Sequence, residues 1–171
     1  MTESDHKKFT RTLEYLSGTS DLGIVVGGDE NGNIKLICYA DASFGVHVDG
    51  KSQGGIIVSF GRGTIIAKCF KHKLVAKSSC EAELITLSDG TSIFVSELDF
   101  ARAQQYIDSK EAGEIFEDNM STIHMANTGK SMSDKTRHIK LRHFFVKQFL
   151  DNGDFVLSYC PTEEMTADIL D

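Results

Sequence analysis

Residues 34–42 read IKLICYADA, and they are followed by GGIIVSF at 54–60 and TIIAKCFK at 64–71. The three runs are short, rich in β-branched residues and flanked by glycine-containing turns, a pattern typical of neighbouring antiparallel strands. We therefore predict a three-stranded meander between residues 34 and 71.

The hydrophobic period changes after this meander. Ser78 and Glu81 have the spacing of a helical capping box, and an apolar stripe runs from there to about residue 106. Gly90 interrupts the stripe and allows a bend or break. Further strands are predicted at 114–118 and 155–160, and further helices at 121–127, 138–150 and 162–170. A meander followed by strands that are reached through helices predicts an α/β fold with a five-stranded mixed sheet flanked by helices.

The first 33 residues differ from the rest of the chain. Phe9, Leu13 and Leu16 recur at helical spacing and predict a short helix over 5–17. The stretch 27–33 is dense in turn-forming residues and reads as a loop or linker. We therefore predict a separate helix and linker at 1–33 and one domain at 34–171.

Composition excludes several classes of protein. The 171 residues are 40% hydrophobic and 25% charged, which is ordinary for a globular domain. No apolar run approaches the roughly 18 residues of a membrane span, and the polar N-terminus lacks the apolar region of a signal peptide. Four cysteines without a C-x-x-C pair predict buried free thiols in a reducing compartment; they are Cys38, Cys69, Cys80 and Cys160.

The formal charge of −7 argues at first against a polyanionic partner. Its distribution changes that interpretation. Residues 68–77 carry four lysines and no acid, and residues 130–147 carry six basic residues and one acid. Two basic blocks therefore lie among acidic ones, and they are either a solvated surface or a site for phosphates.

Four acids lie among apolar or small residues in elements that must pack together: Asp41, Glu83, Asp118 and Asp168. Each acid alone reads equally well as a helix cap or an exposed edge residue. Burying four of them costs free energy unless they are paired, hydrogen-bonded or bound to metal. Carboxylate oxygens from separate elements are the ligands that Mg²⁺ or Mn²⁺ prefers, so together they favour a site for a divalent cation.

Short motifs in a fixed order carry a resemblance to a known family. They lie at residues 11–19, 21–23, 39–43, 50–55, 77–84, 117–119, 136–145 and 159–169. With these motifs the chain, from about Phe9 to Leu170, resembles the ribonuclease H domain of copia-type LTR retrotransposon polyproteins. The segment at 11–23 is similar to the connector that follows the reverse transcriptase in that family.

The resemblance implies a ribonuclease H-like fold over 34–171 and metal-dependent hydrolysis of the RNA strand of an RNA–DNA hybrid. It implies that Asp41, Glu83, Asp118 and Asp168 are the catalytic acids and hold two Mg²⁺ or Mn²⁺ ions. We prefer Glu83 to Glu81 because the residues after Glu83 fit the family pattern better and Glu81 fits the capping box.

Three departures from the family pattern bear on the site. Many cellular ribonucleases H carry a histidine about ten residues before the last aspartate, whereas the loop at 159–162 has none. Glu117 adds an acid beside Asp118, which would shift metal affinity. Cys80 stands where the family usually has threonine.

The predicted partners are an RNA–DNA hybrid and the reverse transcriptase domain of the same polyprotein, without a membrane. The location implied is cytoplasmic, in the virus-like particle of the element, or nuclear. Ser78, Ser79 and Asn119 are candidates for reading the 2′-hydroxyl of the RNA. The remaining predicted nucleic-acid contacts are Ser43, Lys71, Lys73, Lys77, Arg137, His138, Lys140 and Arg142.

Three other functions remain open at this point. A degenerate domain would serve as a structural tether, although the presence of all four acids argues against it. An integrase-like strand transferase would act on DNA ends, and the fourth carboxylate disfavours it. A module that binds hybrid without cutting it would use the basic helix alone.

Overall fold

The computed structural model describes residues 2–28, 30–128 and 137–170. Its centre is a five-stranded sheet in the order β3-β2-β1-β4-β5. The strands are β1 (Leu36–Ser43), β2 (Gln53–Phe60), β3 (Gly63–Lys71), β4 (Gly113–Glu117) and β5 (Phe155–Tyr159). The first three are antiparallel neighbours, whereas β4 runs parallel to both β1 and β5. This confirms the predicted five-stranded mixed sheet.

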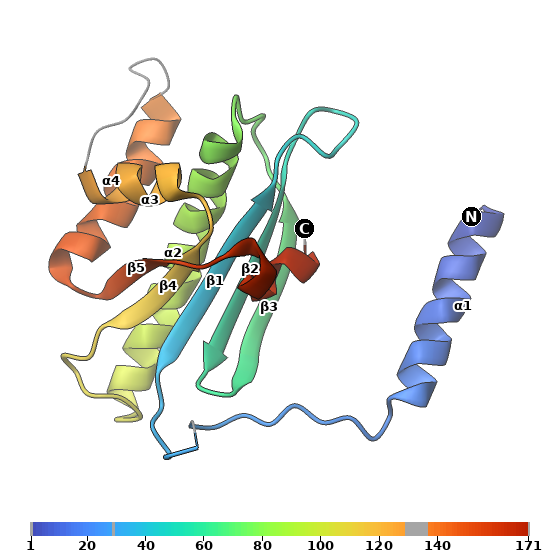
Figure 1. Ribbon diagram of the computed structural model, residues 1–171, viewed down its shortest axis with the longest axis horizontal. Coiled ribbons are helices and arrows are strands. Elements are labelled where there is room, and N and C mark those ends of the chain that lie inside the picture. Colours follow the sequence, from blue (N-terminus) through green and yellow to red (C-terminus); the bar gives the residue numbers. More distant parts are fainter. Residues whose placement is uncertain (1, 29, 129–136, 171) are drawn as a thin grey trace.

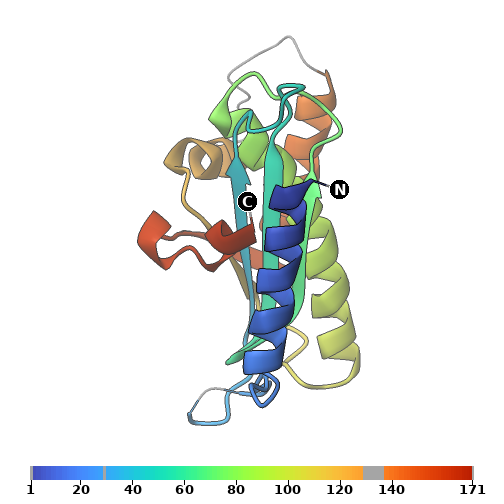
Figure 2. The same ribbon diagram turned by 90° about the vertical axis from the view of Figure 1, so that its right-hand side faces the viewer.

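Helices α2 (Ser79–Ala103) and α4 (Arg137–Asn152) cover one face of the sheet, as the edge-on view in Figure 2 shows. Alternate side chains of the strands pack against them because successive strand residues point to opposite faces. This core contains Leu36, Cys38, Ile56, Val58, Leu87, Phe94, Leu98 and Val146. Helix α3 (Met120–Thr128) follows β4 directly and contacts α2 and α4.

The opposite face is covered near β1 and β2 by the C-terminal segment (Figure 1). This segment contains two short 3₁₀ helices, η1 (Thr162–Glu164) and η2 (Thr166–Leu170). Cys160, Met165 and Ala167 form a small core there, against the stacked rings of Tyr39 and Phe116. This second core fixes the segment that carries Asp168.

The structure settles one point about helices that the sequence left open, and it corrects one prediction. The stripe after Ser78 forms one uninterrupted helix through Gly90, because its apolar face is buried and burial outweighs the penalty of about 1 kcal/mol for a helical glycine. The single helix predicted at 162–170 is instead broken at Met165, whose backbone is extended. The break buries both Met165 and Ala167 against the sheet.

Helix α1 (Glu3–Gly18) stands apart from the sheet in Figure 1 and has no buried residue. The helix itself confirms the prediction at 5–17, but Phe9, Leu13 and Leu16 are exposed. The chain then returns to the body at the β2–β3 turn, where Gly27 bridges to Gly61.

All four cysteines are free. Cys38 and Cys160 are buried as predicted, and Cys80 is half-buried. Cys69 is exposed on the edge strand β3, so the prediction of burial was wrong there. Among the described residues, no helix has the length and apolar character needed to span a membrane.

Candidate metal and active site

Three carboxylates meet at one edge of the sheet. Asp41 lies near the end of β1, Glu83 in the second turn of α2, and Asp118 directly after β4. Each offers an oxygen atom, and these three atoms lie within 4.8 Å of one another. The parallel pairing of β1 with β4 explains the meeting, because parallel strands bring their carboxyl ends to the same edge.

The two most buried members are held inside the fold. Asp41 and Glu83 are each only 5% exposed. The Oδ1 atom of Asp41 accepts a hydrogen bond of 2.9 Å from the N–H of Ala42. Glu83 follows Ala82 and precedes Leu84, which are fully buried, so the packing of α2 sets the position of the Glu83 carboxylate.

Glu81 has a different task. Its N–H donates to the hydroxyl of Ser78, the residue that caps α2, and its carboxylate accepts from the N–H of Lys77 at 2.8 Å. The structure thus places Glu81 in the helix cap and Glu83 beside Asp41 and Asp118.

Glu117 is a fourth acid at this edge, and it is completely buried. Its Oε1 atom accepts from the N–H of Asn119 at 3.2 Å, whereas Oε2 is buried without a hydrogen-bond partner among the described residues. Burial raises the pKa of Glu117 well above its usual value, and the charges of Asp118 and Asp41 add to that rise, while the N–H of Asn119 opposes it. The extra acid noted in the sequence is therefore buried next to Asp118, and its pKa is raised relative to that of an ordinary glutamate.

Asp168 does not belong to this group of three. It is exposed on η2. The segment around it nevertheless lies close to Asp41, because η2 packs on Gly55 and Gly55 is the register partner of Asp41 in the β1–β2 pair. A methyl group on Gly55 would come within 2.8 Å of the carbonyl oxygen of Ala167. The role of Asp168 as a metal ligand stays a prediction.

Thr162 is a residue that the sequence did not single out as a site residue. Its hydroxyl donates to Oδ2 of Asp118 at 2.9 Å. The two residues are 44 positions apart, because Asp118 follows β4 and Thr162 begins η1 after β5, and no local pattern in the sequence relates them. Their proximity depends on the parallel β4–β5 pair.

The three carboxylates of Asp41, Glu83 and Asp118 form a site that suits a divalent cation. Three like charges at this spacing repel one another in a partly buried site, and a hard cation offsets that repulsion while accepting oxygen ligands. The donor set contains no thiol or imidazole, which favours Mg²⁺ or Mn²⁺ over softer metals.

Several predicted contacts for nucleic acid also have structural tasks. The side-chain oxygen of Asn119 accepts from the N–H groups of Ser121 and Thr122 and so caps α3. Ser78 caps α2. Ser79 and Lys77 are exposed next to this cap, and Ser43 ends β1.

Basic side chains surround a cavity of about 370 Å³ between β3, α2 and α4. Lys71 pairs with Asp49 at 2.9 Å, and Arg142 pairs with Asp89 at 2.5 Å. Lys73 lines the cavity and is exposed, whereas Lys140 is half-buried on α4. The side chains of Arg137 and His138 lie outside the described part of the chain, as does the stretch 130–136 of the second basic block.

No protein-family model matches the chain. In sequence it is similar to the retrovirus-related Pol polyprotein from transposon RE2 of Arabidopsis thaliana, with 28% identity over 99% of this chain, and to that from transposon TNT 1-94 of Nicotiana tabacum, with 27% identity over 92%. The chain spans 12% of the length of each of these relatives.

Solved ribonuclease H structures share the fold. The RNase H1 called LC11, in complex with an RNA/DNA hybrid, has a TM-score of 0.55 and 15% identity, covering 80% of this chain and 93% of that one. The protease–reverse transcriptase of prototype foamy virus has a TM-score of 0.52 and 10% identity, covering 81% of this chain and 20% of that one. The predicted resemblance is thereby confirmed: the chain is similar in sequence to the Pol polyproteins of retrotransposons, and it has the ribonuclease H fold.

Proposed function

We propose that this chain is a metal-dependent endonuclease that hydrolyses the RNA strand of RNA–DNA hybrids within a retrotransposon Pol polyprotein. The observation that carries the proposal is the grouping of Asp41, Glu83 and Asp118 at one edge of a ribonuclease H sheet. The RNA/DNA hybrid bound by the LC11 RNase H1 supports the class of substrate.

The carboxylates would hold two Mg²⁺ or Mn²⁺ ions. Asp41 would serve both ions, Glu83 and Asp118 one of them, and Asp168 the other. When bound, such ions lower the pKa of a coordinated water and neutralise the charge that develops on the scissile phosphate. The products would carry 3′-hydroxyl and 5′-phosphate ends.

The protein's own contribution is to fix the carboxylates before substrate arrives. Asp41 and Glu83 project from a strand and a helix that are packed into the core, so their oxygens cannot spread apart without disturbing it. Rigid elements give a site more precise geometry than loops do. The raised pKa of the buried Glu117 disfavours a further negative charge beside these carboxylates.

Short polar side chains beside the acids would distinguish RNA from DNA. Ser78 and Ser79 lie at the start of α2, five and four residues before Glu83 respectively, and Asn119 follows Asp118 directly. Because the side-chain oxygen of Asn119 caps α3, its amide nitrogen is the group that would reach a 2′-hydroxyl.

The basic residues would follow the phosphates of the duplex. Lys71, Lys73 and Arg142 surround the cavity beside α2, and Lys77 lies at the start of that helix. Ser43, Arg137, His138 and Lys140 complete the proposed contact surface. Phosphate contacts of this kind position a duplex without reading its sequence.

The chain would work beside the reverse transcriptase of the same polyprotein, with residues 1–33 as the connector and 34–171 as the nuclease domain. We propose the virus-like particle of the element in the cytoplasm, or the nucleus, as the place of action.

The test is cleavage of a duplex labelled separately on its RNA and DNA strands, with Mg²⁺ and with EDTA. We expect the parent chain to cut only the RNA strand and only with metal. Asp118→Asn should abolish cleavage, while Asp99→Asn, which removes an exposed acid on α2 away from the site, should cleave like the parent.

Other outcomes separate the alternatives. Equal cleavage by Asp118→Asn and the parent would show that the site is wrongly assigned. Hybrid binding that is unchanged in EDTA, without cleavage in Mg²⁺, would show a binding module. Absence of both would indicate a structural tether, and action on DNA ends would indicate a strand transferase.

A further inference from the structure

We propose that Thr162 is a positioning residue for Asp118, so that the loop after β5 orients a metal-binding carboxylate through a hydroxyl group. The inference rests on the proposed metal site. Its basis is the hydrogen bond of 2.9 Å from the Thr162 hydroxyl to Oδ2 of Asp118.

The backbone that carries Thr162 is held on both sides. Before it, the N–H of the buried Cys160 donates to the carbonyl of Glu117 at 3.0 Å, which ties the loop to the residue preceding Asp118. After it, the N–H of Met165 donates to the carbonyl of Thr162 at 3.1 Å, and the Met165 side chain is buried. The hydroxyl is therefore delivered by a fixed backbone.

The side chain itself adds to this order. Threonine is branched at Cβ, so its χ1 angle has few allowed values and its hydroxyl loses little freedom when it binds. The side chain of Asp118 is less restrained, because Asp118 follows the last residue of β4 and is only half-buried. The Thr162 hydroxyl, on a side chain with little rotational freedom, therefore orients the Asp118 carboxylate, which lies beyond the end of the strand.

A hydrogen bond to one oxygen of a carboxylate sets the plane of the group and leaves its other oxygen for a cation. Partners of this kind commonly change metal affinity or activity by about 10–100-fold when they are removed. The loop at 159–162 has no histidine, and at its end a neutral hydroxyl contacts the site. Thr162 thus acts on the metal through Asp118.

The experiment compares Thr162→Val, which keeps the branched shape and removes the donor, with Thr162→Ser, which keeps the donor. Binding of Mn²⁺ to the full chain is measured by loss of the free-ion electron paramagnetic resonance signal, and the unfolding temperature is measured without metal. Glu163→Gln is the control, because it changes an exposed neighbour of Thr162.

We expect Thr162→Val to weaken Mn²⁺ binding about tenfold and to leave the metal-free unfolding temperature close to that of the parent, because the bond is exposed to solvent. Thr162→Ser and Glu163→Gln should bind Mn²⁺ within about twofold of the parent. In an Asp118→Asn background, Thr162→Val should cause no further loss, since the acceptor is altered.

Three results would overturn the proposal: parent-like metal binding by Thr162→Val, equal losses in the valine and serine variants, or an undiminished loss in the Asp118→Asn background. If Thr162→Val does not fold, the hydroxyl is structural and the proposal also fails. Mn²⁺ binding that follows the expected order in a chain that does not cut hybrid would uphold the role of Thr162 and overturn only the proposed nuclease function.

Discussion

Asp41 and Gly55 face each other across the β1–β2 pair, and the missing side chain at Gly55 makes room for the backbone of Ala167. The C-terminal segment therefore lies against the strand pair at the position of the buried acid. The position of the segment that carries Asp168 depends on the close approach of the Ala167 backbone to Gly55, which a side chain at Gly55 would disturb.

We predict that Gly55→Ala lowers the free energy of unfolding by about 1–3 kcal/mol, because the added methyl group would lie 2.8 Å from the Ala167 carbonyl oxygen and the segment must shift. Cleavage of hybrid should fall more than the loss of folded protein explains. Denaturant unfolding and cleavage at a temperature where the variant is folded measure the two effects.

Gly90→Ala is the matched control. A methyl group there would make ordinary contacts with Ile56 and Ala40 at 3.6–3.7 Å, and Gly90 lies within a continuous helix. We expect a gain of about 0.5–1 kcal/mol in the free energy of unfolding and unchanged cleavage. Equal losses in both variants would show that the close approach at Gly55 is not the cause.

The burial of His72 leads us to predict that the stability of the fold depends on pH. It is buried, its Nε2 atom lies 2.9 Å from the Thr86 hydroxyl, and burial lowers its pKa. The charge of Asp89 opposes this shift and that of Arg142 adds to it. The pKa of His72 is lower in the folded than in the unfolded chain. Its contribution to the free energy of unfolding is therefore fully present above about pH 6.5, and it is lost as the pH falls through the folded pKa.

We expect His72→Gln to lower the free energy of unfolding by about 1–3 kcal/mol at pH 8, through the loss of a buried hydrogen bond. The difference between parent and variant should shrink as the pH falls from about 7.5 to 5.5. His6→Gln, an exposed change in α1, should leave the pH profile of the parent intact. A constant difference between His72→Gln and the parent across this range would contradict the assignment.

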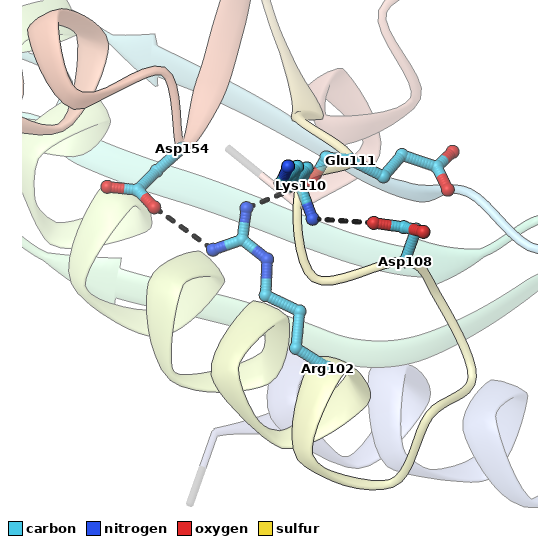
Figure 3. Close-up of polar contacts among 5 residues, drawn as sticks. All are labelled: Arg102, Asp108, Lys110, Glu111 and Asp154. Atoms are coloured by element: carbon cyan, nitrogen blue, oxygen red, sulfur yellow. Dashed lines mark hydrogen bonds and ion pairs between the residues drawn. The ribbon is translucent and has the colours of Figure 1, made fainter.

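Arg102 links three segments at the far end of the sheet (Figure 3). It donates to Asp154 at 3.0 Å and to the carbonyl of Glu111 at 2.9 Å, so it joins the end of α2 to the residues before β4 and β5. We predict that Arg102→Met costs about 1–3 kcal/mol in chemical denaturation, because it leaves a partly buried carboxylate and a carbonyl without their donor.

The exposed pair of Arg62 and Glu30, also 2.9 Å apart, offers a comparison. Arg62→Met should cost less than about 0.5 kcal/mol, since solvent screens an exposed pair. A similar cost for the two arginines would refute a special role for Arg102.

We predict that Lys73 contributes to the salt dependence of hybrid binding. It is exposed and lines the basic cavity beside α2. In EDTA, Lys73→Ala should weaken binding severalfold and reduce the slope of log affinity against log salt by about 1. Fluorescence anisotropy over a salt series measures both quantities.

Lys110→Ala removes an exposed lysine near Arg102, at the other end of the molecule, and should leave the slope unchanged (Figure 3). Because the net charge is −7, we also expect the parent to bind hybrid more weakly than micromolar at physiological salt without metal. A tight, salt-insensitive complex would exclude the proposed phosphate surface.

The sequence predicted the strands and most helices because their hydrophobic periods are unambiguous. It also predicted a cation site from four acids, and the structure brings Asp41, Glu83 and Asp118 together while Asp168 lies outside this group. The broken helix at Met165 was missed because the burial of Met165 and Ala167 depends on contacts with strands far away in the chain. Thr162 was missed for the same reason, because its partner lies on another loop.

The parallel pairing of β1 with β4 also determines when the site can exist. Asp41 and Glu83 are 42 residues apart and Glu83 and Asp118 are 35 apart, so no two of the acids meet through local structure. Contacts between distant residues form late in folding because loop closure must precede them. A chain in which β1 and β4 are not yet paired holds these carboxylates apart, so the proposed metal site would be complete only when the sheet is complete.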